Sequence, residues 1–207
     1  MKNITALKVI LKLSLIFPTS FLVFQFPAMA AEAQSLPDGY DLDEYGSALV
    51  HRESGFAFPA EMSGFKRTNS HEKDFSGDYV QIGYDRKIGD DIIAVRIAVV
   101  HLADLTAKDH YEIMKPIAMS YFSSTSVVSE GDYPIFKKSG IPAYQGIFSG
   151  LQENKPWHFS LTTIDYGYWD ARLVAAYPEK IDAKAQKAIH DLVAAFQWQR
   201  PSPPGEK

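Results

Sequence analysis

The chain has 207 residues, of which 25 are acidic and 21 are basic, and its formal net charge is −4. This acidic balance argues against general nucleic-acid binding and against docking of a basic patch on anionic lipid. The absence of cysteine excludes disulfides, a thiol nucleophile and a lipid attached to cysteine.

Residues 1–30 have the layout of a secretory signal peptide. Three lysines and no acidic residue precede an apolar run over 13–26, and Ala28-Met29-Ala30 then supplies a small-x-small cleavage pattern. The pattern predicts cleavage between Ala30 and Ala31 and export to the periplasm or the extracellular space. The alternative is an uncleaved anchor, although Lys12 and Pro18 leave an apolar stretch shorter than the ~20 residues that span a bilayer.

The rest of the chain predicts one folded domain over 47–198. Residues 31–46 are small and acidic, which predicts an extended leader, and the proline-rich residues 199–207 predict a disordered tail. The carboxylates of the leader lack the spacing of a calcium-binding loop, so a solvated acidic segment is the favoured interpretation.

The first half of the domain predicts strands. Short candidates over 47–51 and 56–58 precede a polar candidate at Phe65–Lys73. Tyr79–Tyr84 alternates in polarity, and Ile92–Leu102 is a β-branched apolar run typical of a central strand. The two are expected to form a hairpin across the turn at 89–91.

A helix is predicted from about Ala107 to Phe122. Thr106 and Asp109 have the spacing of a capping box, and Pro116 is expected to kink or split the helix. A loop rich in serine and glycine is expected to follow.

The second half predicts an antiparallel meander and a closing helix. The strand candidates are separated by short turns: Ala143–Leu151, Trp157–Ile164 and Tyr168–Tyr177. Six apolar residues at helical spacing then predict an amphipathic helix from about Asp182, its expected N-cap, to Trp198.

The element order predicts an α+β fold: an antiparallel sheet of about six to seven strands flanked by two main helices, in an α/β/α sandwich. In this order the chain resembles the PsbP-like family. The likeness rests on Gly55-Phe-Ala-Phe-Pro59, the strand Ile92–Leu102, and Tyr168-Trp-Asp-Ala-Arg172 continuing through Tyr177-Pro178 into the final helix. The resemblance implies an α/β/α sandwich with a binding or assembly-assisting role, and no functional residue of that family is matched.

Sequence motifs for catalysis are missing. We find no zinc-binding His-Glu-x-x-His, no nucleophile elbow and no phosphate-binding glycine loop, and the six histidines form no i, i+4 pair. We therefore expect no metal, no cofactor and no catalytic residue.

Arg96 is the most unusual residue, because it interrupts an apolar strand. A buried arginine is costly unless it is paired. One interpretation is a structural ion pair with Asp85, Asp170 or another carboxylate. The other is an anion-binding site on the sheet, formed by Arg96 together with Arg172.

Aromatic residues are also abundant, and four of them gather at the ends of the predicted meander: Trp157, Tyr166, Tyr168 and Trp169. If exposed, these rings would contact a sugar or a partner protein. The alternative is that they fill the core.

Three functional hypotheses follow. The leading one is an exported, non-enzymatic domain that binds a partner protein or an envelope component. The second is a protein that binds a small anionic or sugar ligand, and the third is a hydrolase with a dispersed site. Nucleic acid is not an expected partner, and contact with a membrane is expected only through an uncleaved signal.

Overall fold

The computed structural model describes residues 36–73, 77–102, 105–136 and 140–198. The predicted signal peptide and C-terminal tail lie outside the described residues. The described residues from Pro37 onward belong to one compact unit. No helix in the described ranges is long and apolar enough to cross a membrane.

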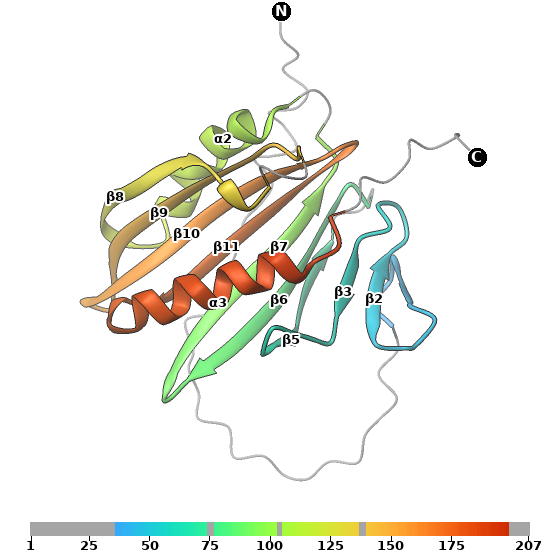
Figure 1. Cartoon of the computed structure of the whole chain (residues 1–207), viewed down its shortest axis with the longest axis horizontal. Helices are drawn as coiled ribbons and strands as arrows, with labels where there is room; N and C mark the ends of the chain where they lie inside the picture. Colours follow the sequence, from blue (N-terminus) through green and yellow to red (C-terminus); the bar gives the residue numbers. More distant parts are fainter. Residues whose placement is uncertain (1–35, 74–76, 103–104, 137–139, 199–207) are drawn as a thin grey trace, which may run out of the picture. The chain divides into compact units, whose positions relative to one another are not determined.

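The core of this unit is an eight-stranded antiparallel sheet (Figure 1). Its spatial order is β4-β5-β6-β7-β11-β10-β9-β8. The strands are β4 (Glu61–Met62), β5 (Phe65–Lys73), β6 (Tyr79–Ile88), β7 (Asp91–Val100), β8 (Ser123–Asp132), β9 (Ala143–Gln152), β10 (Lys155–Tyr166) and β11 (Trp169–Pro178). The predicted hairpin is present as β6 and β7, and the predicted meander as β9, β10 and β11.

A second, three-stranded sheet precedes the main one. It contains β1 (Tyr40–Leu42), β2 (Ala48–His51) and β3 (Ala57–Pro59). β1 lies within the segment expected to be an extended leader, and it pairs with β2 in antiparallel fashion.

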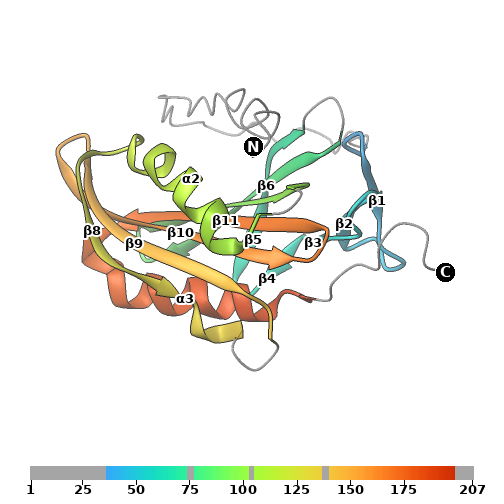
Figure 2. The ribbon, with the colours of Figure 1, turned by 90° about the horizontal axis from the view of Figure 1, so that it is seen from above.

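One helix covers each face of the main sheet (Figure 2). α2 (Ala107–Met119) begins with the predicted capping box, because Thr106 and Asp109 bond each other's backbone N–H. Of the two expectations for Pro116, a split helix is wrong, because α2 continues to Met119 without interruption. Pro116 frees only the carbonyl of Glu112, which lies on the exposed side, where water can satisfy it.

α3 (Asp182–Ala195) covers the opposite face, after the short 3₁₀ helix Glu179–Ile181. The predicted apolar stripe is buried: Ala185, Ala188, Ile189, Leu192 and Val193. The prediction that Asp182 is the N-cap is wrong, because Ile181 occupies that position and Asp182 is the first helical residue. Its carboxylate instead accepts hydrogen bonds from the side chains of Tyr177, Gln186 and His158.

The predicted strand count is too low, mainly because the expected serine-rich loop is the ten-residue edge strand β8. Most of β8 is exposed, so it has no apolar face that would reveal a strand in the sequence. Its pairing with β9 shifts register twice. Bulges of this kind help to protect a sheet edge from pairing with other chains.

Candidate functional site

Arg96 and Arg172 lie on the same face of the sheet, the one that α2 covers in part. In the register of β7 and β11, Arg96 is opposite Val174 and Arg172 is opposite Ala98. Residues directly opposite share a face, as do residues two positions apart, so the two arginines are diagonal neighbours. The α2 side is identified by Thr163, which is opposite Arg172 and donates a 2.7 Å hydrogen bond to the Ala107 carbonyl of α2.

Arg96 is only half-buried, with 25% of its side chain exposed. Its Nη1 lies 4.0 Å from Asp85 Oδ1 and donates to the Val95 carbonyl at 3.2 Å. The opposite residue is Gly83, where an added Cβ would lie 2.7 Å from Nη1, so the missing side chain makes room for the guanidinium. Burial raises the pKa of Asp85, and the charge of Arg96 opposes that shift.

Arg172 is buried and already engaged. Its Nη1 lies 3.0 Å from Met114 Sδ of α2, and its guanidinium carbon lies 5.9 Å from the centre of the Tyr79 ring. Arg172 is 4% exposed. The structure therefore places the two arginines on one face but at different depths, with only Arg96 accessible to an anion from solvent.

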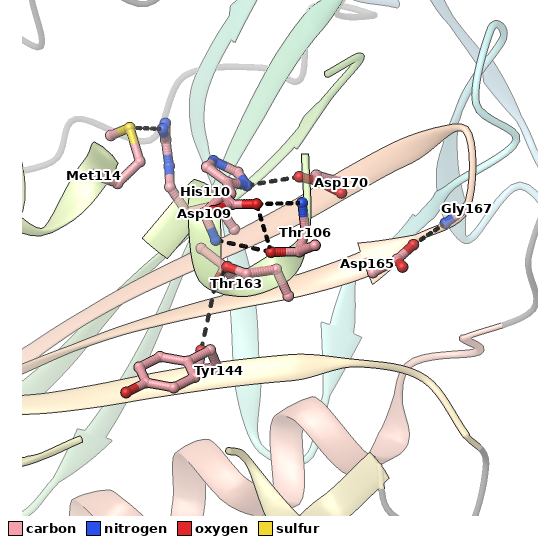
Figure 3. Close-up of polar contacts among 11 residues, drawn as sticks. Thr106, Asp109, His110, Met114, Tyr144, Thr163, Asp165, Gly167 and Asp170 are labelled. Atoms are coloured by element: carbon pink, nitrogen blue, oxygen red, sulfur yellow. Dashed lines mark hydrogen bonds and ion pairs between the residues drawn. The ribbon is translucent and has the colours of Figure 1, made fainter. Parts of the chain in front are cut away.

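A buried polar pair that the sequence did not reveal lies beneath α2 (Figure 3). His110 Nδ1 lies 3.0 Å from Asp170 Oδ2, and the two side chains are 1% and 3% exposed. Neither atom has a hydrogen bond of good geometry within the described residues, so the contact is a close but poorly aligned one. Burial lowers the pKa of His110, although its contact with Asp170 opposes the shift. Burial also raises the pKa of Asp170.

The burial of this pair limits what it can do. A histidine beside a carboxylate has the composition of an acid–base pair, but a substrate would have to reach it. Here the helix and the sheet enclose both side chains. Within the described residues, no group of three histidine or acidic side chains is placed to bind a metal ion.

Three of the four predicted aromatic residues lie together at one end of the meander. Tyr166 and Trp169 are 4% and 6% exposed and pack in the core, where Tyr166 contacts Phe56 and Trp169 contacts His51. Tyr168 is 49% exposed and its ring lies 4.2 Å from that of His101. Trp157 lies at the other end of β10, opposite Gly150 and near Phe122. The four rings do not form one exposed surface.

A cavity of about 290 Å³ opens at the start of α2. Its walls include Thr106, Lys108, Tyr133 and Tyr144. The Lys108 ammonium lies 5.7 Å from the centre of the Tyr144 ring, and both residues line the cavity. None of the predicted site residues, the two arginines and the four aromatic residues, lines this cavity.

The most exposed large apolar side chain in the described residues is Tyr45, at 81%. It lies in the turn between β1 and β2, residues 43–47, which we call the Tyr45 turn. The sequence does not single out this residue, because the exposure of one tyrosine depends on how the surrounding chain folds. The nearby acidic run was the only signal in the sequence.

Comparisons with known proteins identify no family. No protein-family model matches the chain, and no curated protein sequence matches it. Among solved structures, LpqN, which is involved in cell envelope biogenesis of Mycobacterium tuberculosis, is 9% identical with a TM-score of 0.38, covering 62% of this chain and 80% of LpqN. A mutant of the protein Mog1 is 9% identical with a TM-score of 0.32, covering 63% of this chain and 95% of Mog1. Both likenesses are too distant to transfer a function.

Proposed function

We propose that this chain is an exported, non-enzymatic domain that binds a partner protein or another component of the cell envelope. The observation that carries the proposal is the Tyr45 turn, which holds an 81% exposed tyrosine between the paired strands β1 and β2. Tyrosine is enriched among the residues that dominate the binding energy of protein interfaces. The resemblance to the PsbP-like family favours the same role, and residues 1–30 supply the expected export signal.

A second candidate function is binding of a small anionic or sugar ligand at Arg96. It is favoured by Asp85 Oδ1, which is buried and has no hydrogen-bond partner within the described residues, while Arg96 Nη1 is 4.0 Å away. A ligand hydroxyl between the two could donate to the carboxylate and accept from the guanidinium. A single water would satisfy the two groups as well as a ligand hydroxyl, so this candidate ranks second.

Export is tested by the intact mass of the protein recovered from outside the cytoplasm. We expect a chain that begins at Ala31. A mass that includes residues 1–30 would contradict cleavage and would indicate that the domain stays anchored to the membrane.

Partner binding is tested by capture. The exported protein, tagged at its C-terminus, is purified and mixed with envelope extract at increasing concentrations of untagged protein. We expect one or more captured proteins that the untagged domain displaces in a saturable manner. Capture that is not displaced, or no capture, would contradict the proposed function.

A further inference from the structure

The Tyr45 turn is held rigid by one side chain. The carboxylate of Asp43 accepts hydrogen bonds from the backbone N–H of Ser47 at 2.6 Å, from the Ser47 hydroxyl at 2.9 Å and from the backbone N–H of Ala48 at 2.9 Å. These bonds, the Ala48 bond first, hold the pKa of Asp43 below its usual value. Backbone bonds between Asp43 and Ala48 and between Gly46 and Asp43, each 3.0 Å, close the turn, and Gly46 provides its left-handed residue at φ 67°.

This rigid turn projects apolar surface into solvent. Tyr45 is 81% exposed, and Leu42, at the end of β1, is 47% exposed. The pairing partner of Leu42 is Leu49, which is buried, so β2 anchors the hairpin in the core while β1 carries the exposed side chain. Because the hydrogen bonds of Asp43 already fix the backbone of the turn, little backbone entropy is lost when the turn is bound.

The carboxylates of the Tyr45 turn that lack an ion-pair partner within the described residues give it a negative charge. The segment 37–46 contains four carboxylates and no basic residue. Asp41 is paired with Arg52 at 3.0 Å and Asp38 with Lys73. Within the described residues, Asp43 and Glu44 have no ion-pair partner, and a hydrogen bond with Glu44 raises the pKa of the Tyr45 hydroxyl. The exposed ring therefore has an acidic rim.

We infer that the Tyr45 turn is the anchor by which this domain docks into a small apolar pocket on a partner protein whose surrounding surface is basic. This inference rests on the proposed partner-binding function and identifies the surface and the partner's chemistry. Tyr45 and Leu42 supply the apolar contact, and Asp43 and Glu44 face the partner's lysine and arginine side chains. Charge complementarity of this kind speeds association and makes binding sensitive to salt.

Site-specific photo-crosslinking tests the inference in the cell that exports the protein. The photoreactive residue p-benzoylphenylalanine replaces Tyr45 in the full chain, and in a matched chain it replaces Tyr168, which is also exposed and lies on the turn between β10 and β11. We expect a covalent adduct with a different protein from position 45 and at least about tenfold less from position 168. Sequencing of the adduct should find lysine or arginine residues beside the crosslinked site.

Charge variants test whether the acidic side chains of the Tyr45 turn contribute to partner binding, which the proposed function alone does not require. Glu44→Lys should lower the yield from position 45 about threefold or more, whereas Asp90→Lys, on the exposed turn between β6 and β7, should leave it unchanged. In extract, the yield should fall as NaCl rises from about 50 to about 500 mM. Thermal melts check that each variant is folded.

Several outcomes would overturn the inference. An adduct between two copies of this chain would identify a homodimer contact, and an adduct with lipid would identify a membrane contact. Equal yields from positions 45 and 168 would show that the turn has no special role. If the domain captures a displaceable partner but position 45 forms no adduct, the proposed function stands and this inference fails. If no partner is captured, both fail.

Discussion

His110 Nδ1 of α2 lies 3.0 Å from Asp170 Oδ2 of β11, and both side chains are almost fully enclosed. Helix and sheet are joined here by two buried titratable groups, on the same face as the buried Arg172. Because burial shifts the pKa of each group toward its neutral form, the stability of the fold should depend on pH through this contact.

The first prediction concerns His110. Its pKa is lowered in the folded state, so below the ordinary value near 6.5 the unfolded chain binds a proton that the folded chain does not. The free energy of unfolding should therefore fall as the pH decreases from about 7.5 to about 5.5. Urea unfolding should show a weaker pH dependence for His110→Gln, which cannot titrate. Parallel curves for the two proteins would contradict this account of the contact.

The second prediction concerns Asp170, whose raised pKa gives the opposite sign. The folded chain takes up the proton at a pH where the unfolded chain does not, so the buried carboxylate reduces stability as the pH rises through this range. Asp170→Asn removes that charge and keeps the shape. Its free energy of unfolding relative to the wild type should increase between about pH 4 and about pH 8. Asp90→Asn, at an exposed turn, is the control and should track the wild type. A relative stability that decreases with pH would refute the argument.

The third prediction concerns the attachment of α3. Leu192 is fully buried in the stripe that faces the sheet. Leu192→Ala should reduce the free energy of unfolding by about 2–5 kcal/mol, the range for a buried leucine. Lys184→Ala, on the exposed side of the same helix, should change it by less than about 0.5 kcal/mol. Denaturant unfolding of both variants provides the comparison, and a loss below about 0.5 kcal/mol for Leu192→Ala would mean that α3 is loosely attached.

The fourth prediction concerns Arg96. Because the ion pair with Asp85 is 4.0 Å long and its side chains are 25% and 44% exposed, solvent screens it. Arg96→Met should therefore cost less than about 1 kcal/mol, rather than the ~3–5 kcal/mol of a deeply buried pair.

Gly83→Ala provides the contrast at the same place. The added Cβ would lie 2.4 Å from the Thr68 hydroxyl and 2.7 Å from Arg96 Nη1, so both side chains must move. Thermal melts should show a larger loss for Gly83→Ala than for Arg96→Met. A larger loss of stability for Arg96→Met than for Gly83→Ala would indicate that Arg96 forms a buried structural ion pair.

Elements with an apolar periodicity could be predicted from the sequence. The strand predicted at Ile92–Leu102 is β7, which ends two residues earlier at Val100, and the predicted apolar stripe of α3 is buried. β8 could not be predicted in this way, because an exposed edge strand buries no apolar face. β1 has three residues, too few to show a periodicity of apolar side chains, and its pairing with β2 depends on the tertiary fold.

Some residues of the candidate site could likewise be predicted from the sequence, and others could not. Arg96 was recognised because a charge within an apolar strand is conspicuous in the sequence. His110 was missed because its partner Asp170 lies far along the chain, and only the register of β11 beneath α2 brings them together. The core positions of Tyr166 and Trp169 were also beyond prediction, since an aromatic residue near a turn can face either solvent or the interior.

The dissociation constant of the captured partner tests the central claim most directly. It should be measured for the wild type, for Tyr45→Ala and for Arg96→Met, which alters the alternative ligand site. We predict that Tyr45→Ala weakens binding by about tenfold or more and that Arg96→Met changes it by less than about twofold. A partner whose affinity is unchanged by Tyr45→Ala but lost in Arg96→Met would contradict the account and assign binding to the sheet face.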